Sequence, residues 1–488
     1  MSDLLSRKLV IGLLLLLYLP YVNVHGYKHI GSESVGFRSV YAASKIAFAR
    51  GAAPYAPDAF ADSASLIGEP APAAPPNRII PPYPYSPPSL LLVYPLTFFA
   101  FTTARFLLLA LSHTCVLSLF YLVVVKIIGP AIEPPIRNSL APLCLLYLLV
   151  FHPVIANFQY GDIDIIILSL LCLTWYAVKT ERAPAIIALP LLVAVLLNVS
   201  AAVCVAFLMI RRKFRATGWV VAGVSVAALL AFAVLPREVW ADWIANVLPA
   251  AGYVATPADP LSAAQPHNHS INGFIWRLSA EQHFTDALVA VRDVIPLSLR
   301  NATVAFAEFV KRWTNLGPAG LLTCLLSLGV IGVTVLACYR SARKNGARRD
   351  RLIDLEFSLF LATMVLVAPN SSESQLVFLL PAALLAIHIL LVAPHNRFYQ
   401  AAAASSLCIL AWNLSLETPA WQTGLWTMIV PIKFYAVAFI WCFFVGRVWN
   451  SDELPPPPFW RASAARSLQA AMAAERRAHR RFLDSVRR

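Results

Sequence analysis

Two aspartates separated by a single residue stand at the start of an apolar run in the stretch QYGDIDIIIL. Asp162 and Asp164 follow Gly161, and ionisable side chains in and near membrane spans are costly to bury and usually functional. Two carboxylates at this spacing can position hydroxyls or bind a cation, and a glycosyl acceptor hydroxyl needs a general base. The alternative is that Asp162 only caps a helix N-terminus, which is worth about 0.3–1 kcal/mol.

Three other polar groups are candidates for the same chemistry. Glu33 is the acid nearest to an amphipathic segment at residues 35–50, and we take it as a third catalytic candidate. The stretch NHSINGFIWR contains Asn268, His269 and Arg277, and a guanidinium suits bidentate phosphate binding, although an ordinary turn explains the first two equally well. Glu373 lies in a serine-rich stretch between two apolar runs, where it either forms a wall of the cleft or caps the next helix.

The composition indicates what positions these residues. The chain has 488 residues, of which 59% are hydrophobic and 13% charged, whereas soluble globular proteins have about 25% charged residues. Long apolar runs recur without strict alternation, which predicts an all-α polytopic membrane protein rather than a β-barrel. At roughly twenty residues each, the runs correspond to about 10–12 transmembrane helices.

The net charge of +14 is concentrated in basic clusters at residues 211–215, 340–351 and 461–488. Because cytoplasmic loops are enriched in Lys and Arg, these clusters predict the topology of a multi-pass plasma (inner) membrane protein. Residues 1–450 are then one transmembrane domain with two large extracytoplasmic loops, 26–88 and 237–317. Residues 451–488 form a basic cytoplasmic tail that contacts membrane lipids, and nothing suggests nucleic-acid binding.

Two stretches are expected to depart from regular spans. Residues 89–103 predict a short interfacial or re-entrant helix, and the run 185–210 predicts a broken hairpin that turns near Asn198. The eight cysteines all lie in apolar runs without a CxxC pair, so neither a disulfide nor a metal site is expected from them. We expect no cofactor, and a divalent cation at the two aspartates is left open.

The segment 35–50 places Phe37, Val40 and Tyr41 on one face at helical spacing, and Gly51 is expected to end it. Arg38 in this segment is a second candidate for binding phosphate. Since the segment is too polar to span a bilayer, we expect it to lie against the membrane surface. If its loop belongs to the site, Glu33 should lie within about 15 Å of Asp162 or Asp164, the width of a pocket for a sugar phosphate.

This loop resembles the first extracytoplasmic loop of GT-C glycosyltransferases, and more narrowly that of the bacterial polyprenyl-phosphate-mannose-dependent α-mannosyltransferases. The matching residues are Tyr41-Ala42-Ala43, Gly51, Pro54-Tyr55 and Tyr85-Ser86-Pro87-Pro88. The likeness continues to about residue 381. It implies a GT-C-like bundle, a lipid-linked sugar donor and a site at the outer surface, and we include Tyr41 and Tyr85 among the substrate-binding candidates.

The chain departs from that family at the residues that carry its chemistry. The catalytic Asp of the family would fall at Gly36, its Lys is replaced near Asn198, and its histidines are replaced around Ser374 and Gln375. The expected function is transfer of mannose or a related sugar from a polyprenyl-phosphate donor to an envelope glycan or glycolipid. The alternatives are a transporter of lipid-linked intermediates and a non-catalytic relative in an envelope-synthesis complex.

Overall fold

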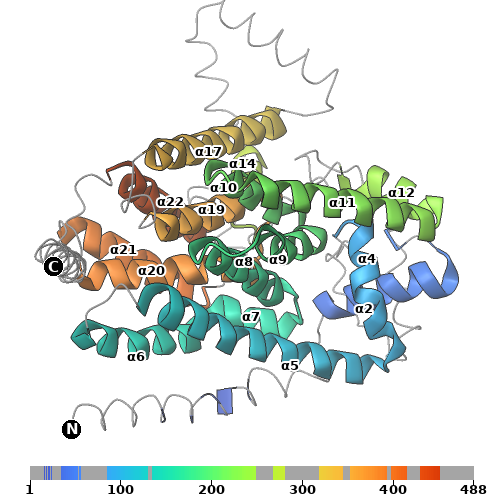
Figure 1. Ribbon diagram of the computed structural model, residues 1–488, viewed down its shortest axis with the longest axis horizontal. Helices are drawn as coiled ribbons and strands as arrows, with labels where there is room; N and C mark the ends of the chain where they lie inside the picture. The colour runs from blue at the N-terminus through green and yellow to red at the C-terminus, as the bar shows by residue number, and fades with distance from the viewer. Residues whose placement is uncertain are drawn as a thin grey trace, which may run out of the picture.

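The computed structural model describes residues 35–52, 54–55, 85–129, 134–248, 267–280, 318–343, 352–392, 397–414 and 429–450, together with six residues between positions 12 and 24 (Figure 1). The described residues form helices and turns and contain no strand. Glu33, the tail at 451–488 and most of the two long loops lie outside the described residues.

The helices of the first half are α2 (Val35–Lys45), α4 (Pro87–Val93), α5 (Phe101–Phe120), α6 (Pro134–Val150), α7 (His152–Tyr160), α8 (Asp164–Lys179), α9 (Pro184–Leu197), α10 (Val203–Ile210), α11 (Phe214–Val234) and α12 (Arg237–Asp242). Those of the second half are α14 (Ile271–Ala280), α17 (Pro318–Ala342), α19 (Ile353–Val367), α20 (Leu380–Val392), α21 (Arg397–Ala411) and α22 (Ile432–Trp449). Six short 3₁₀ or π segments extend or link them: η2 (Ile46–Arg50), η3 (Tyr94–Phe98), η4 (Tyr121–Ile128), η6 (Val199–Ala202), η7 (Trp243–Val247) and η9 (Ser374–Leu379).

The chain is an all-α polytopic membrane protein. Among the described residues, five helices are long and apolar enough to cross a bilayer, and a sixth results if the bent pair formed by α6 and α7 is one span. Helices such as α8, with 16 residues, and α19, with 15, are shorter than a full span although they lie inside the bundle. The predicted 10–12 spans concern the whole chain and stay a prediction; within the described residues, several apolar runs fold as short or broken helices.

Helices α8 and α19 form the centre of the bundle. Trp175 of α8 stacks on Phe357 of α19 with ring centroids 5.0 Å apart, and both side chains are fully buried. The outermost helices differ from these two: α11 exposes Trp219, Leu229 and Phe232, as a helix facing lipid should. Because lipid is as apolar as these side chains, close packing rather than exclusion of water stabilises the centre.

Ion pairs fix the relative direction of the central helices. Lys179 at the end of α8 pairs with Asp354 at the start of α19 at 2.6 Å, and Trp175 donates to the same carboxylate. Arg211, just after α10, pairs with Glu356 at 2.6 Å. We call this the ion-pair end of the bundle. The first residue of α8 and the last residue of α19 therefore lie together at the opposite end.

The predicted break near Asn198 is confirmed. Helix α9 ends at Leu197, the Asn198 side chain accepts a hydrogen bond from Ser200 N, and α10 begins at Val203. Asn198 and Ser200 line a narrow recess with Ser371 and Gln375, which follow the end of α19. Since Arg211 lies at the ion-pair end, α9 and α10 run in opposite directions, as expected of a hairpin.

The amphipathic segment forms α2 and η2, and Gly51 ends it in the left-handed conformation with φ of 61°. Its apolar face is buried, and Tyr41 donates a hydrogen bond to Phe99 O at 2.8 Å. The predicted short helix is also confirmed, since α4 and η3 end at Phe98 before α5 begins. Figure 1 shows α2, α4 and α12 gathered at one end of the bundle.

Candidate active site

Asp162 lies in a three-residue turn between α7 and α8. Gly161 ends α7 with φ of 68°, a conformation that L side chains rarely adopt, and the backbone N of Asp162 bonds to Asn157 O at 3.1 Å. Asp164 is the first residue of α8 and is 1% exposed, whereas Asp162 is half-buried. The turn thus brings two carboxylates to the end of the bundle opposite the ion pairs.

Ser374 connects this pair to the stretch after α19. Its hydroxyl faces both carboxyl groups, can donate its one proton to either of them, and lies 3.1 Å from the hydroxyl of Ser372. Burial raises the pKa of Asp162 to about 6, while the hydrogen bond with Ser374 opposes that rise. A carboxylate with a pKa near neutrality is suited to accept a proton at physiological pH.

Helix α2 packs directly against the turn. A Cβ added to Gly36 would lie 1.9 Å from Asp162 Oδ1 and 3.0 Å from Tyr160 O, so only glycine fits while Asp162 keeps this position. Position 36 is where the family resemblance places a catalytic Asp, and here the Asp162 carboxylate fills the adjoining space. Glu33 lies outside the described residues, so its distance from Asp162 stays a prediction.

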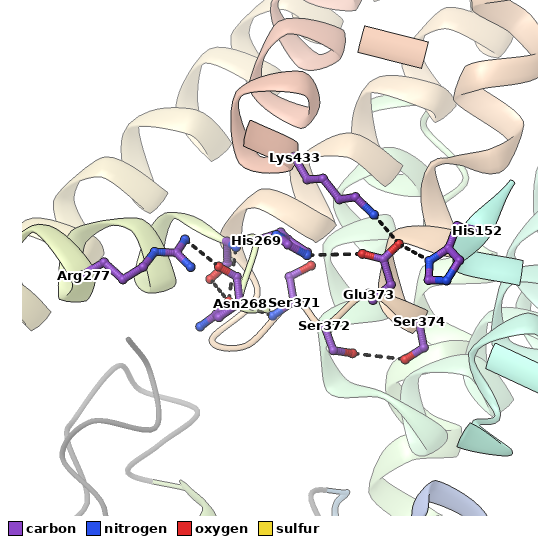
Figure 2. Close-up of polar contacts among 10 residues, drawn as sticks. His152, Asn268, His269, Arg277, Ser371, Ser372, Glu373, Ser374 and Lys433 are labelled. Atoms are coloured by element: carbon purple, nitrogen blue, oxygen red, sulfur yellow. Dashed lines mark hydrogen bonds and ion pairs between the residues drawn. The ribbon is translucent and has the colours of Figure 1, made fainter. Parts of the chain in front are cut away.

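Glu373 is surrounded by three basic or titratable side chains (Figure 2). Its Oε1 accepts from His152 Nδ1 at 2.8 Å and from Lys433 Nζ at 2.5 Å, and its Oε2 lies 3.4 Å from His269 Nε2. Burial alone would raise the pKa of Glu373, but the hydrogen bonds from His152 and His269 and the charge of Lys433 hold it well below its usual range. Glu373 is therefore an ionised, charge-compensated carboxylate rather than a capping group alone.

The loop before α14 docks onto the same stretch. The Asn268 side chain accepts from Ser371 N at 3.0 Å, and His269 N donates to Ser371 O at 2.8 Å. Arg277 Nη2 donates to the backbone oxygen of Asn268 at 2.9 Å and so fixes this loop from α14 (Figure 2). A Cβ at Gly273 would lie 2.4 Å from Asn268 O, which shows how closely the helix approaches.

The sequence-predicted residues thus fall into two sets. The structure brings Asp162, Asp164, Glu373, Asn268 and His269 to one stretch, residues 369–375. The remaining candidates have other settings, as follows: Arg277 is buried and holds the Asn268 loop, Arg38 is half-buried on α2, Tyr41 packs between Phe37 and Phe101, and Tyr85 accepts a hydrogen bond from Tyr55 at its backbone oxygen.

Sequence reasoning missed His152 and Lys433. Lys433 is the second residue of α22 and is 1% exposed, and a lone cation at the start of an apolar run is a signal for a buried partner. His152 precedes Pro153 at the bend between α6 and α7, and no sequence pattern links it to Glu373, which is 221 residues away. No group of three or more His, Cys, Asp or Glu side chains that could hold a metal ion occurs in the described part of the chain.

The arrangement offers a proton acceptor in Asp162, hydrogen-bond acceptors for hydroxyl groups, and a compensated ionic cluster beside them. Neither the curated proteins nor the solved structures compared with the chain include a match. The model of glycosyltransferase family 87 matches residues 83–369, which include both aspartates and the Asn268 loop. The match covers more than half of the chain, which therefore belongs to glycosyltransferase family 87.

Proposed function

We propose that this glycosyltransferase moves mannose or a related pyranose from a polyprenyl-phosphate donor to an envelope glycan or glycolipid on the extracytoplasmic side of the membrane, on a fold of GT-C type. The reaction class follows from the family. The observation that carries the rest is the meeting of Asp162 and Asp164 with Ser374, next to Glu373, at one end of a membrane-embedded bundle. In this proposal the donor stays anchored in the bilayer and reaches the site from there.

Asp162 acts as the general base in this proposal. Its carboxylate takes the proton of an acceptor hydroxyl while that oxygen forms a bond to the anomeric carbon of the sugar. The bond between the anomeric carbon and the phosphate oxygen breaks, and its electron pair stays on the phosphate. Polyprenyl phosphate leaves with one additional negative charge, and the configuration at the anomeric carbon is inverted.

The neighbouring carboxylates take different roles. Asp164 is buried beside Asp162, and two carboxylates in one site raise each other's affinity for a proton. Glu373 is paired with Lys433 and with two histidines, so it is a poor proton acceptor and instead positions its neighbours in residues 369–375. Asn268 and His269 dock on the same stretch, and in this proposal their loop lies beside the acceptor.

The test is sugar transfer in membranes containing Asp162→Asn. The substitution keeps the size of the side chain and removes the base, and loss of a general base costs roughly 10²–10⁴-fold in rate. The assay measures incorporation of labelled sugar from polyprenyl-phosphate mannose into lipid-extracted acceptors. Glu238→Gln is the matched control, because Glu238 is an exposed acid on α12 with no part in the site.

We expect near-normal expression for both variants and loss of transfer only for Asp162→Asn. Full activity in Asp162→Asn would move the base elsewhere, with Glu33→Gln as the next variant. If the unmodified protein transfers no sugar from any polyprenyl-phosphate donor, the proposal is wrong and a non-catalytic relative is favoured.

A further inference from the structure

Helix α17 lies along one edge of the bundle, beside α14 and α22 (Figure 1). One face of it is exposed over most of its length, and the apolar side chains on that face are Leu322, Leu325, Leu326, Leu328, Val333 and Leu336. Gly329 and Gly332 lie among them, and nothing is found within 4 Å of a Cβ added to either glycine. This apolar face is therefore open to the bilayer rather than packed against another described helix.

The apolar face of α17 ends in two arginines that lie over aromatic rings. Arg340 and Arg343 are both exposed, and their spacing of three residues places them on the same side of the helix. The guanidinium carbon of Arg340 lies 4.8 Å from the centroid of the Trp449 ring of α22, and that of Arg343 lies 4.8 Å from the Tyr339 ring. The rings thus hold both guanidinium groups at the edge of the apolar face.

The positive charge of these two arginines is not compensated within the described part of the chain. Glu356 accepts from Ser341 of α17, which places this end of the helix at the ion-pair end, but Glu356 forms its ion pair with Arg211. Asp354 is paired in the same way with Lys179. A guanidinium presents a planar fork of donors that fits phosphate oxygens. An unpaired positive group next to an exposed apolar face fits a ligand with a negative head and apolar chains.

We propose that α17 and Trp449 form a binding site for an anionic phospholipid, whose phosphate is bound by Arg340 and Arg343 and whose acyl chains lie along the apolar face. One leaflet of the hydrocarbon core is about 15 Å thick, which corresponds to about ten helical residues and reaches from the arginines back to the two glycines. Residues 340–351 are predicted to be cytoplasmic, and the cytoplasmic leaflet carries anionic lipids. The site lies at the end of the bundle opposite Asp162 and does not depend on the proposed function.

Lipid binding is measured by native mass spectrometry on the full-length protein, which is delipidated in detergent and titrated with phosphatidylglycerol or with phosphatidylcholine of identical acyl chains. We expect the anionic lipid to bind more tightly than the zwitterionic one. Arg340→Gln and Arg343→Gln should each lower the affinity for phosphatidylglycerol about fivefold, and the double variant should lower it about thirtyfold. The affinity for phosphatidylcholine should stay unchanged, because its net charge is zero.

Two further variants separate a built site from general attraction between charges. Trp449→Leu removes the ring under Arg340 and keeps every charge, so it should lower the affinity for phosphatidylglycerol about two- to fivefold. Arg215→Gln is the matched control, because Arg215 is exposed near the start of α11 at the same end of the bundle and lies over no ring among the described residues. It should bind phosphatidylglycerol like the unmodified protein. Size-exclusion profiles and thermal unfolding identify any variant that is misfolded.

The proposal is overturned if the folded double variant binds phosphatidylglycerol as tightly as the unmodified protein, or if Arg215→Gln loses as much affinity as Arg340→Gln. Equal binding of the two lipids by the unmodified protein also overturns it and leaves the arginines to an acidic protein partner. Glycerol phosphate, added as a competitor, should not displace the lipid. Displacement at the same concentration would show that the arginines bind a free anion, which contradicts a role for the apolar face.

Discussion

At the scale of single residues, the Asp162 carboxylate has three neighbours that restrict it. Helix α2 packs against it at Gly36, Ser374 hydrogen-bonds to it, and Asp164 is buried beside it. The contact with Gly36 is steric, the contact with Ser374 is a hydrogen bond, and the effect of Asp164 is electrostatic. Each restricts a different property of the carboxylate: its position, its orientation and its affinity for protons.

The affinity for protons predicts the pH dependence of sugar transfer. Burial raises the pKa of Asp162 to about 6, and the base works only when it is deprotonated. The rate should therefore be maximal above pH 7 and half-maximal near pH 6. Below pH 6 it should fall about tenfold for each pH unit.

The measurement is kcat/KM for sugar transfer between pH 4.5 and 8 on purified protein in nanodiscs. Glu238→Gln should give the same profile as the unmodified protein. A rate that stays constant down to pH 4.5 would contradict the assignment of Asp162 as the base.

The position of Asp162 predicts the effect of one methyl group. In Gly36→Ala the new Cβ would lie 1.9 Å from Oδ1, so the carboxylate must move. A misplacement of about 1 Å at a catalytic group can cost roughly 10²-fold in rate, and we expect that loss with near-normal thermal stability. Gly218→Ala on α11 is the control, since nothing lies within 4 Å of its Cβ. Equal activity of the two variants would show that Asp162 has no fixed role.

The sequence predicted some of these residues and not others, for a physical reason. Asp162, Asp164 and Glu373 could be found because a carboxylate at the edge of an apolar run is costly and therefore conspicuous. Lys433 and His152 were missed because their role depends on Glu373, which lies 60 and 221 residues away in the chain. The steric role of Gly36 could not be predicted from the sequence, because it depends on the distance between α2 and the α7–α8 turn.

At the scale of elements, the ion-pair end holds α8, α10, α17 and α19 together through ion pairs and a hydrogen bond. Arg211 and Glu356 are 3% and 0% exposed at their side chains, and Glu356 also accepts from Ser341 at 2.6 Å. A buried pair contributes little net stability, but removal of one partner leaves a buried charge uncompensated, at a cost of about 3–5 kcal/mol. These contacts therefore determine which helices meet more than how strongly they associate.

We expect Arg211→Met and Glu356→Leu each to lower the thermal stability of the detergent-solubilised protein, and the double variant to recover most of the loss. The reason is that the double variant removes both charges. Thermal unfolding followed by tryptophan fluorescence measures the effect, and Arg182→Gln, an exposed charge after α8, is the control. A double variant as unstable as the sum of the two single variants would contradict this account.

The order of elements was largely readable from the apolar runs, including the break at Asn198 and the short helix before α5. Composition does not reveal where an apolar run ends early, so the short helices among the described residues could not be recognised from it. Helix α7 begins at the bend of 44° after α6, and this bend at His152-Pro153 shortens both helices. A proline is tolerated in the first turn of a helix, so Pro153 alone did not predict that one helix ends and another begins there.

At the scale of the whole molecule, the charge distribution still predicts the topology. The basic residues at 461–488 should be cytoplasmic because positively charged segments are retained on that side. In Ser467→Cys, with the exposed Cys408 and Cys442 replaced by Ser, a membrane-impermeant maleimide should label the thiol only after permeabilisation. Ser262→Cys in the second loop is the control and should be labelled in intact cells. Labelling of the tail in intact cells would contradict the predicted topology.

The close approach of Gly36 to Asp162 also has a consequence for how this sequence can change over time. A side chain at position 36 and a carboxylate at position 162 compete for one space, so the effect of a substitution at either position depends on the residue at the other. We therefore expect the two positions to be epistatic, since moving the acidic group from the turn to α2 passes through an intermediate with two acids or with none. We expect either intermediate to transfer sugar poorly, so a change at one position alone is disfavoured.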